Sequence, residues 1–304
     1  MSDFKEMLKS LLVSEKSIFR QEEPMSIHTT FRIGGPARFY AGPGDREELA
    51  AVIRLCRQEG VPYAVLGNGS NLLVSDKGFD GVVISMEENW AYAEAEGSCI
   101  RAGAGLLLSR AARMAFERSL TGLEFASGIP GTAGGALVMN AGAYGSEIKD
   151  VLKHAVVMTP EGGILTLNGE ELKLGYRTSC IPDREYVVLE AVFELKQGEK
   201  EAIGERMKEL AQKRREKQPL EYPSAGSTFK RPEGYFAGKL IQDAGLRGFQ
   251  TGGAQVSEKH CGFVINRGGA TAEDVIKLCL HVKEQVKLQF GVELEMEVKR
   301  LGEF

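Results

Sequence analysis

Two glycine-rich stretches limit what this chain can fold into more than any other feature of its sequence. The first runs from Leu66 to Leu73 as Leu-Gly-Asn-Gly-Ser-Asn-Leu-Leu, and the second runs from Gly128 to Gly145. Glycine adopts positive φ and lets a backbone approach a ligand closely, so successive N–H groups of such loops can bind a phosphate. One such cluster could simply make tight turns. Two long clusters with small polar residues instead predict a site for a phosphate-bearing cofactor.

The common nucleotide-binding motifs do not describe these stretches. Gly67 and Gly69 would need a third glycine at position 72 to complete the dinucleotide-binding fingerprint, and that residue is Leu72. The Gly-Lys-Ser/Thr signature of a P-loop does not occur in the sequence. Neither of these two nucleotide-binding folds is therefore expected.

Hydrophobic periodicity divides the chain into three parts. Residues 1–29 carry apolar residues on one helical face and are expected to form a helical leader. Residues 30–197 alternate helices and strands, with a helix at 46–59 that Gly60 and Pro62 close. The strands expected in this part lie at 63–66, 81–85, 99–102, 155–159, 163–167 and 186–195.

Residues 198–304 have a different character and are expected to form a separate, smaller α+β domain. Its expected elements are a highly charged helix at 199–218, a strand at 261–265, a helix at 272–290 and a final strand at 293–300. In the final strand, apolar and charged residues alternate, so one face should pack while the other presents carboxylates to solvent.

Composition excludes several classes of protein. The 304 residues carry a formal net charge of −4, which gives no overall indication of nucleic-acid binding. No apolar run approaches the ~20 residues of a membrane span, and the start of the chain does not read as a signal peptide. Five scattered cysteines indicate reduced, packed thiols, and four histidines without paired spacing indicate no metal site. We expect a cytoplasmic monomer that binds neither nucleic acid nor membrane.

The run Thr29–Ala37 reads Thr-Thr-Phe-Arg-Ile-Gly-Gly-Pro-Ala and precedes both glycine stretches. These three motifs, in this order, resemble the MurB family of UDP-N-acetylenolpyruvoylglucosamine reductases, within the flavoprotein superfamily typified by vanillyl-alcohol oxidase. The resemblance spans residues 20–302. It implies that residues 30–197 form an FAD-binding domain of the PCMH type in two subdomains, and that residues 198–304 bind the substrate.

The resemblance also implies that the glycine stretches hold FAD without a covalent bond. The residues then expected to contact FAD are Gly67, Asn68, Gly69, Ser70, Asn71, Leu72, Gly128, Pro130, Gly131, Thr132, Gly134, Gly135, Asn140, Gly142, Ala143, Tyr144 and Gly145.

The implied activity is the NADPH-dependent, FAD-mediated reduction of UDP-N-acetylglucosamine enolpyruvate to UDP-N-acetylmuramate in peptidoglycan precursor synthesis. Hydride delivered to C3 of the enolpyruvyl group leaves negative charge that must be stabilised as an enolate. A positioned donor must then protonate C2. Arg177 offers a permanently charged, bidentate fork for the carboxylate and the enolate. Without its Tyr-Arg-x-Ser context, which matches the family, Arg177 would be assigned to a surface turn.

The resemblance assigns proton donation to Ser227 and the third catalytic role to Glu297. A serine hydroxyl is a weak acid and needs a neighbour that stabilises its alkoxide; Lys230 is a candidate. In isolation, the Gly-Ser pair would indicate only a turn. Glu295 lies on the same strand face as Glu297, so geometry alone does not choose between them. The family's Glu-Val-Arg pattern selects Glu297, although Lys299 stands at its arginine position.

Contacts to the substrate are expected from the last third of the chain. Lys230, Lys239 and Asn266 are the candidates for binding the UDP group, where a lysine acts as a point charge for phosphate. Few residues separate Arg177 from the helix at 199–218, which leaves no room for the substrate-clamping loop of one family branch. The chain thus resembles the loop-lacking type II branch, and Tyr235 is a candidate for closing over the substrate.

Two other functions remain open on the sequence alone. One is an oxidase of the same superfamily that acts on an alcohol or a free sugar with O2. Many such relatives tether FAD through a histidine, but His28 lies outside both glycine stretches, so FAD is expected to be non-covalent. The other is a non-catalytic module that binds a flavin or a nucleotide sugar.

Overall fold

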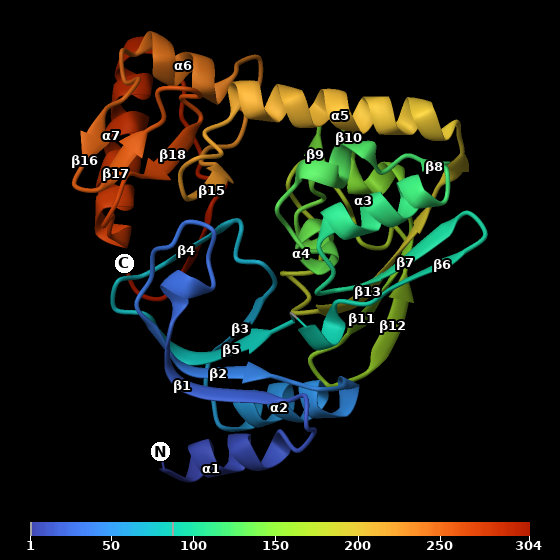
Figure 1. The fold of residues 1–304 in the computed structure, drawn as a ribbon. Coiled ribbons are helices and arrows are strands. Elements are labelled where there is room, and N and C mark those ends of the chain that lie inside the picture. The colour runs from blue at the N-terminus through green and yellow to red at the C-terminus, as the bar shows by residue number, and fades with distance from the viewer. Residues whose placement is uncertain (1, 87) are drawn as a thin grey trace. The chain divides into compact units, whose positions relative to one another are not determined.

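The computed structural model describes residues 2–86 and 88–304 (Figure 1). The chain forms two compact units, each assembled from segments that lie far apart in the sequence. The first unit comprises Met1–Gln21, Phe39–Asn68 and Gly81–Gln212; the second comprises Glu22–Arg38, Gly69–Asp80 and Lys213–Phe304. The domain limits inferred from the sequence, at 29/30 and 197/198, stay predictions.

An antiparallel sheet with the strand order β12-β11-β13-β7-β6 organises the first unit. Its strands are β6 (Ala93–Glu96), β7 (Cys99–Gly103), β11 (Leu152–Met158), β12 (Ile164–Leu167) and β13 (Val187–Glu194). All of β13 except its last residue is buried. That burial explains why its sequence is an almost continuous run of β-branched, aromatic and other apolar residues.

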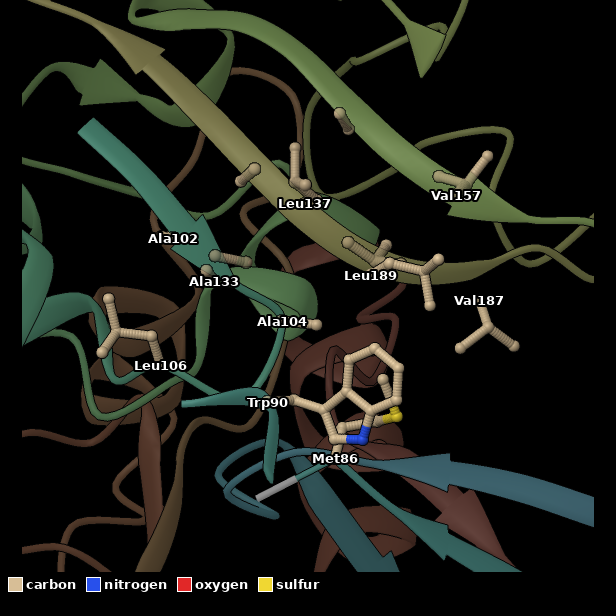
Figure 2. Packing of buried hydrophobic residues seen from close by; sticks show 14 of the residues in the cluster. Met86, Trp90, Ala102, Ala104, Leu106, Ala133, Leu137, Val157, Val187 and Leu189 are labelled. Carbon is tan, nitrogen blue, oxygen red and sulfur yellow. The ribbon is translucent and has the colours of Figure 1, made fainter. Parts of the chain in front are cut away.

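Two helices, α3 (Leu108–Glu117) and α4 (Ala133–Val138), pack against this sheet. Figure 2 shows the small side chains of Ala104 and Ala133 where α4 meets the strands. A Cβ atom at Gly134 would lie 3.0 Å from the Ala104 Cβ, and the Gly134 N–H donates to the Ala104 carbonyl over 2.9 Å. Small residues therefore let α4 approach the sheet closely, which fixes the second glycine stretch on it.

A second sheet has the order β1-β2-β5-β3. Its strands are β1 (Ile18–Pro24), β2 (Pro36–Gly42), β3 (Tyr63–Leu66) and β5 (Phe79–Ser85), and the helices beside it in the sequence are α1 (Ser2–Leu11) and α2 (Arg46–Gln58). Short antiparallel pairs join β8 (Leu120–Thr121) to β14 (Lys196–Gln197) and β9 (Gly142–Ala143) to β10 (Ser146–Glu147). Asp45 begins α2 by accepting a hydrogen bond from the Glu48 N–H over 2.9 Å.

Buried Glu48 joins the segment after α1 to the start of α2. Its carboxylate accepts hydrogen bonds from the backbone N–H groups of Val13, Ser14 and Gly44 over 2.9, 2.7 and 2.8 Å, and from the Ser17 hydroxyl. Burial alone would raise the pKa of this carboxyl, but the hydrogen bonds outweigh it and hold the pKa below its ordinary value.

We expect Glu48→Gln to lower the free energy of unfolding at pH 7 by about 1–3 kcal/mol. A pKa depressed in the folded state stabilises the protein above the unfolded-state pKa, and that stabilisation is lost as pH falls through the folded-state value. The difference between wild type and variant should therefore shrink from pH 7 toward pH 3. Urea denaturation at several pH values measures it, and Glu47→Gln on the exposed side of the same helical turn is the control. A difference independent of pH would contradict this role.

The second unit contains an antiparallel sheet with the order β15-β18-β17-β16. Its strands are β15 (Ser224–Ser227), β16 (Gln250–Thr251), β17 (Ala254–Val256) and β18 (Phe263–Asn266). Helices α6 (Ala237–Asp243) and α7 (Ala272–Phe290) contribute to the same apolar core. A parallel pair joins β4 (Leu72–Val74) to β19 (Lys299–Leu301). α5 (Lys200–Lys217) spans the sequence limit between the two units.

Three helices predicted from periodicity are confirmed as α2, α5 and α7, and the strand predicted at 261–265 is confirmed as β18. Two predictions need correction. The predicted helical leader is α-helical only over α1, because the apolar pattern stops there; Ile18–Pro24 hydrogen-bonds as a strand, and a single 3-10 turn follows at Met25–Ile27. The final strand is confined to β19, although Leu294 and Val298 are buried and Glu293 and Glu295 are exposed as the alternation predicts.

All five cysteines are free thiols, and all except Cys99 are buried. Burial raises the pKa of the Cys56 and Cys279 thiols to about 12, which makes both poor nucleophiles. Among the described helices, none combines the length and the apolar character needed to cross a bilayer.

Candidate functional site

The start of the first glycine stretch, up to Asn68, meets the second stretch within the first unit. A Cβ atom at Gly67 would collide with the hydroxyl of Thr132, and the Asn68 side chain donates to the Pro130 carbonyl over 2.5 Å. Gly67 must therefore lack a side chain for the loops to lie this close. The structure thus brings together two stretches that are some sixty residues apart, as a shared cofactor site requires.

The turn into α4 presents donors and open space. Thr132 caps the helix by accepting from the Gly135 N–H over 3.3 Å. Among the described residues, the N–H groups of Gly131 and Thr132 have no protein acceptor. Gly135 is exposed, and a Cβ atom there would meet only the Thr132 hydroxyl, at 3.5 Å. Protein packing therefore does not require glycine at 135, whereas close approach of a ligand would. These residues fit a phosphate-bearing cofactor.

A tight hairpin follows α4. Strands β9 and β10 are joined by Tyr144 and Gly145, which have positive φ values of 56° and 88°. Positive φ at both central positions is the mark of a type I′ turn. A Cβ atom at Gly142 would lie 2.7 Å from the Ser146 carbonyl oxygen, so glycine is required in β9.

Arg177 lies in a second tight turn that is attached to this hairpin. Gly175 and Thr178 pair with each other, and Arg177 between them has φ +53°. The Arg177 Nη2 donates to the Gly142 carbonyl over 3.1 Å. The Ser179 hydroxyl anchors the end of the turn by donating to the Val138 carbonyl over 2.7 Å. A bulky residue with positive φ is uncommon and concentrates at functional sites.

Ser227 ends β15 in the second unit. It is exposed, and the preceding Gly226 has φ +77° with no atom within 4 Å of its potential Cβ. The pairing of β15 with β18 shifts register between Ser224 and Ser227. This bulge turns the end of the strand and leaves the Ser227 hydroxyl accessible to a ligand.

Glu297 lies on a segment that is hydrogen-bonded to the residues after Ser227. The Glu297 N–H donates to the Thr228 carbonyl over 2.8 Å, and the Lys230 N–H donates to the Glu295 carbonyl over 2.8 Å. The structure therefore brings Ser227 and Glu297 close to each other from opposite ends of the second unit's longest segment.

The Lys230 side chain forms an ion pair with Glu295, whose side chain is 71% exposed. Lys230 is thus bound to a solvent-facing carboxylate rather than to the Ser227 hydroxyl. The two glutamates differ in solvent exposure: Glu295 is exposed, whereas Glu297 is half-buried.

The second half of the first glycine stretch supports Glu297. The Asn71 side chain donates to the Glu297 carbonyl over 3.2 Å, and the Lys299 N–H donates to the Asn71 carbonyl over 3.0 Å. Leu72 then begins β4, which pairs with β19. Sequence reasoning assigned Asn71 to the cofactor and missed this contact.

A residue of the run Thr29–Ala37 makes supporting hydrogen bonds that the sequence did not indicate. The Thr30 N–H donates to the Gly69 carbonyl over 3.3 Å, and its hydroxyl donates to the Ser224 carbonyl over 2.7 Å. A Cβ atom at Gly69 would collide with the His28 carbonyl. Thr30 therefore ties the first glycine stretch to the strand that carries Ser227. The only sequence signal was the polar Thr-Thr pair before buried Phe31.

The expected substrate contacts occupy different environments. Asn266 is buried; its side chain donates to the Phe31 carbonyl over 3.2 Å and accepts from the Gly268 and Ala270 N–H groups over 2.9 and 3.2 Å. Lys239 forms an i,i+4 ion pair with Asp243 at 2.6 Å on the surface. Tyr235 is 47% exposed.

Arg177 belongs to the first unit, whereas Ser227 and Glu297 belong to the second. Joint action of the three on one substrate therefore stays a proposal.

Two family models match the chain. Residues 37–168 match a model described as an FAD binding domain, and residues 218–301 match a model described as the C-terminal domain of UDP-N-acetylenolpyruvoylglucosamine reductase. These matches confirm the predicted α+β fold class, with an FAD-binding domain of the PCMH type and a smaller C-terminal domain.

Curated relatives match nearly the whole chain. UDP-N-acetylenolpyruvoylglucosamine reductase of Agathobacter rectalis is 56% identical over 296 residues, covering 93% of this chain and 94% of the relative. The protein of the same name from Lachnoclostridium phytofermentans is 55% identical over 300 residues, covering 97% and 96%. The crystal structure of this reductase from Thermus caldophilus superposes with a TM-score of 0.81 at 36% identity, covering 94% of this chain and 100% of that one.

Proposed function

This chain belongs to the family of UDP-N-acetylenolpyruvoylglucosamine reductases, and we propose from this that it reduces UDP-N-acetylglucosamine enolpyruvate to UDP-N-acetylmuramate for peptidoglycan synthesis. NADPH is the proposed hydride donor, and FAD is the proposed non-covalent cofactor. Within the family match, the single observation that carries the proposal is the hydrogen bonding of the Glu297 segment to the residues that follow Ser227. It supports a proton donor and a carboxylate acting on one substrate.

FAD, when bound, supplies the means to accept a hydride from a nicotinamide and to deliver one to the enolpyruvyl group. The residues proposed to hold it are those of the two glycine stretches except Asn140, whose side-chain amide is hydrogen-bonded within the protein. The N–H groups of Gly131 and Thr132 would bind phosphate oxygens, and the open face at Gly135 would admit the cofactor.

Three side chains of this chain are proposed to act on the substrate. The guanidinium of Arg177 neutralises the substrate carboxylate and stabilises the enolate charge. The hydroxyl of Ser227 donates a proton to C2. The carboxylate of Glu297 acts with Arg177 at the enol end. Lys230 is not used for the serine alkoxide in this proposal, because it is paired with Glu295.

The cofactor site can be tested with one glycine. We expect Gly135→Ala to lower the affinity for FAD about tenfold or more, which corresponds to about 1.4 kcal/mol. The apoprotein should keep its stability or gain up to about 1 kcal/mol, because alanine is the better helix former. Flavin fluorescence titration and thermal melting of the apoprotein measure the two effects. Gly163→Ala is the control, because a Cβ atom at Gly163 would likewise meet a threonine hydroxyl, that of Thr159, at 3.3 Å. Unchanged FAD affinity would exclude cofactor approach at this face.

We also propose that the chain is of the type II branch and that Tyr235 closes over the bound substrate. Tyr235 lies beside exposed Phe236, over whose ring the Arg231 guanidinium lies at 3.9 Å. In this proposal Tyr235→Phe raises the KM for the sugar nucleotide several-fold and leaves the KM for NADPH unchanged. Steady-state kinetics measures both constants, and an unchanged KM for the sugar nucleotide would remove Tyr235 from this role.

The proposed activity has a direct steady-state test. Consumption of NADPH should depend on the enolpyruvyl sugar nucleotide, and mass spectrometry should find a product heavier by two hydrogen atoms. An oxidase would instead consume O2 with an alcohol or a sugar, and a binding module would do neither. We place the reaction in the cytoplasm, where sugar nucleotides and NADPH are available, and propose a monomer.

A further inference from the structure

The side chain of Asn140 is completely buried at the end of α4 and all of its polar groups are engaged. Its amide nitrogen donates to the Glu147 carboxylate over 2.9 Å and to the Gly175 carbonyl over 3.0 Å. Its amide oxygen accepts from the Lys149 N–H over 2.9 Å. The residue itself has φ +43°. Three directed hydrogen bonds from one buried amide indicate a fixed structural position.

These three bonds join the two pieces of backbone that hold Arg177. Gly175 begins the turn that carries Arg177, so the bond from Asn140 fixes the base of its side chain. Glu147 lies in β10, opposite Gly142, whose carbonyl accepts from the Arg177 Nη2. The bonds to Glu147 and Lys149 therefore fix the hairpin that orients the guanidinium tip. Asn140 is therefore hydrogen-bonded both to the turn that carries Arg177 and to the hairpin that binds its guanidinium.

The position calls for an amide rather than a carboxylate of the same shape. Two of its three partners, the Glu147 carboxylate and the Gly175 carbonyl, are acceptors, and one, the Lys149 N–H, is a donor. An aspartate would satisfy Lys149 and would place an oxygen against both acceptors. The side chain of Asn140 is thus used within the protein, and this use differs from the cofactor contact expected from the sequence.

We propose that Asn140 is a positioning residue for Arg177. It holds the guanidinium where the substrate carboxylate binds, a role that rests on the proposed function of Arg177. If so, its effect on the reaction passes through Arg177 and vanishes when Arg177 is replaced. A purely structural role would instead add to the effect of any Arg177 substitution.

The test compares Asn140→Asp alone, Arg177→Lys alone and the double variant, each as FAD-loaded protein. We expect Asn140→Asp to slow flavin reoxidation by the enolpyruvyl sugar nucleotide about tenfold or more, with flavin reduction by NADPH and FAD affinity within about twofold of wild type. In the Arg177→Lys background, Asn140→Asp should have no further effect on reoxidation. A full multiplication of the two effects would overturn the proposal.

Two further variants separate positioning from loss of fold. The double variant Asn140→Asp, Glu147→Gln exchanges the amide and the carboxylate. It should restore the hydrogen bond between residues 140 and 147 and the melting temperature, but the Gly175 carbonyl still lacks its donor. We expect reoxidation to stay slow in it. Asn89→Asp is the matched control, because Asn89 also donates to two carbonyls, those of Lys16 and Pro43. If the double variant at 140 and 147 instead regained both the reoxidation rate and the melting temperature, Asn140 would contribute to stability alone.

One readout does not depend on the enzyme's substrate. Arginine-selective 15N NMR of the FAD-loaded protein reports the Arg177 guanidinium, whose signal is assigned by its loss in Arg177→Lys. Asn140→Asp should shift or broaden that signal, whereas Asn89→Asp should not. An unchanged signal contradicts the positioning role. A wild-type flavin that the sugar nucleotide fails to reoxidise contradicts the proposed function instead, so the two failures are distinguishable.

Discussion

Ser227→Ala should slow flavin reoxidation by UDP-N-acetylglucosamine enolpyruvate about a hundred- to ten-thousand-fold, the range typical of a lost general acid. Reduction of the flavin by NADPH should stay close to the wild-type rate, because no proton from Ser227 is needed in that half-reaction. The exposed position of Ser227 at a strand bulge and the neighbouring Glu297 segment support this division. Rapid-mixing absorbance at the flavin band measures each half-reaction separately.

Two controls make the Ser227 result specific. Ser224→Ala removes a hydroxyl from the other end of β15 and should leave both half-reactions unchanged. Ser227→Cys keeps an acidic hydrogen at the same position and should retain part of the reoxidation rate. Equal slowing of both half-reactions in Ser227→Ala would show that the residue supports the fold or the cofactor and does not donate the proton.

Arg177→Lys should lower the rate of flavin reoxidation by substrate about a hundredfold or more. Lysine keeps the positive charge but replaces a planar, two-pronged donor with a single point charge, so it cannot pair bidentately with a carboxylate. It also loses the fixed bond from Nη2 to the Gly142 carbonyl, which defines the direction of the guanidinium. The expected loss therefore comes from orientation rather than from charge.

Stopped-flow kinetics checks this prediction in the same two half-reactions. Arg184→Lys, on an exposed turn nearby in the sequence, is the control and should behave as wild type. Reduction by NADPH should be retained in Arg177→Lys. A variant that reoxidises normally would show that charge alone suffices, and the proposed bidentate contact would be wrong.

Much of the fold could be predicted from the sequence because its signals are local. The apolar spacing in α2, α5 and α7 and the breakers at their ends defined those helices within one or two residues. Long-range pairing was not predictable in the same way. The alternation near the C-terminus predicted which side chains are buried, but a hydrogen-bonded ladder forms only at Lys299–Leu301, where β4 is available as a partner.

The candidate site shows the same division. Glycine clusters predicted a cofactor site, and the close approach of Gly67 to Thr132 is the tertiary reason for one of those glycines. The positions of Asn140, Thr30 and Ser179 depend on contacts with residues far away in the sequence, such as Gly175 for Asn140. No local pattern distinguishes an asparagine that binds a ligand from one that fixes a turn.

Charge pairing was equally invisible in the sequence. Lys230 stands three residues after Ser227 and was a candidate partner for it, but the antiparallel contact around Phe229 and Met296 places it against Glu295. In a regular strand Glu295 and Glu297 would lie on one face and be equally exposed. The isolated pairing of Phe229 with Met296 replaces such a strand here, and the two glutamates differ in exposure.

The most direct test of the proposed reductase activity is an anaerobic stopped-flow experiment on the wild-type, FAD-loaded protein. NADPH should bleach the flavin absorbance in the first mixing step, and UDP-N-acetylglucosamine enolpyruvate should restore it in the second, without O2 and with one equivalent of UDP-N-acetylmuramate formed. A flavin that NADPH reduces but the enolpyruvyl sugar nucleotide leaves bleached, and that only O2 reoxidises, would contradict the account.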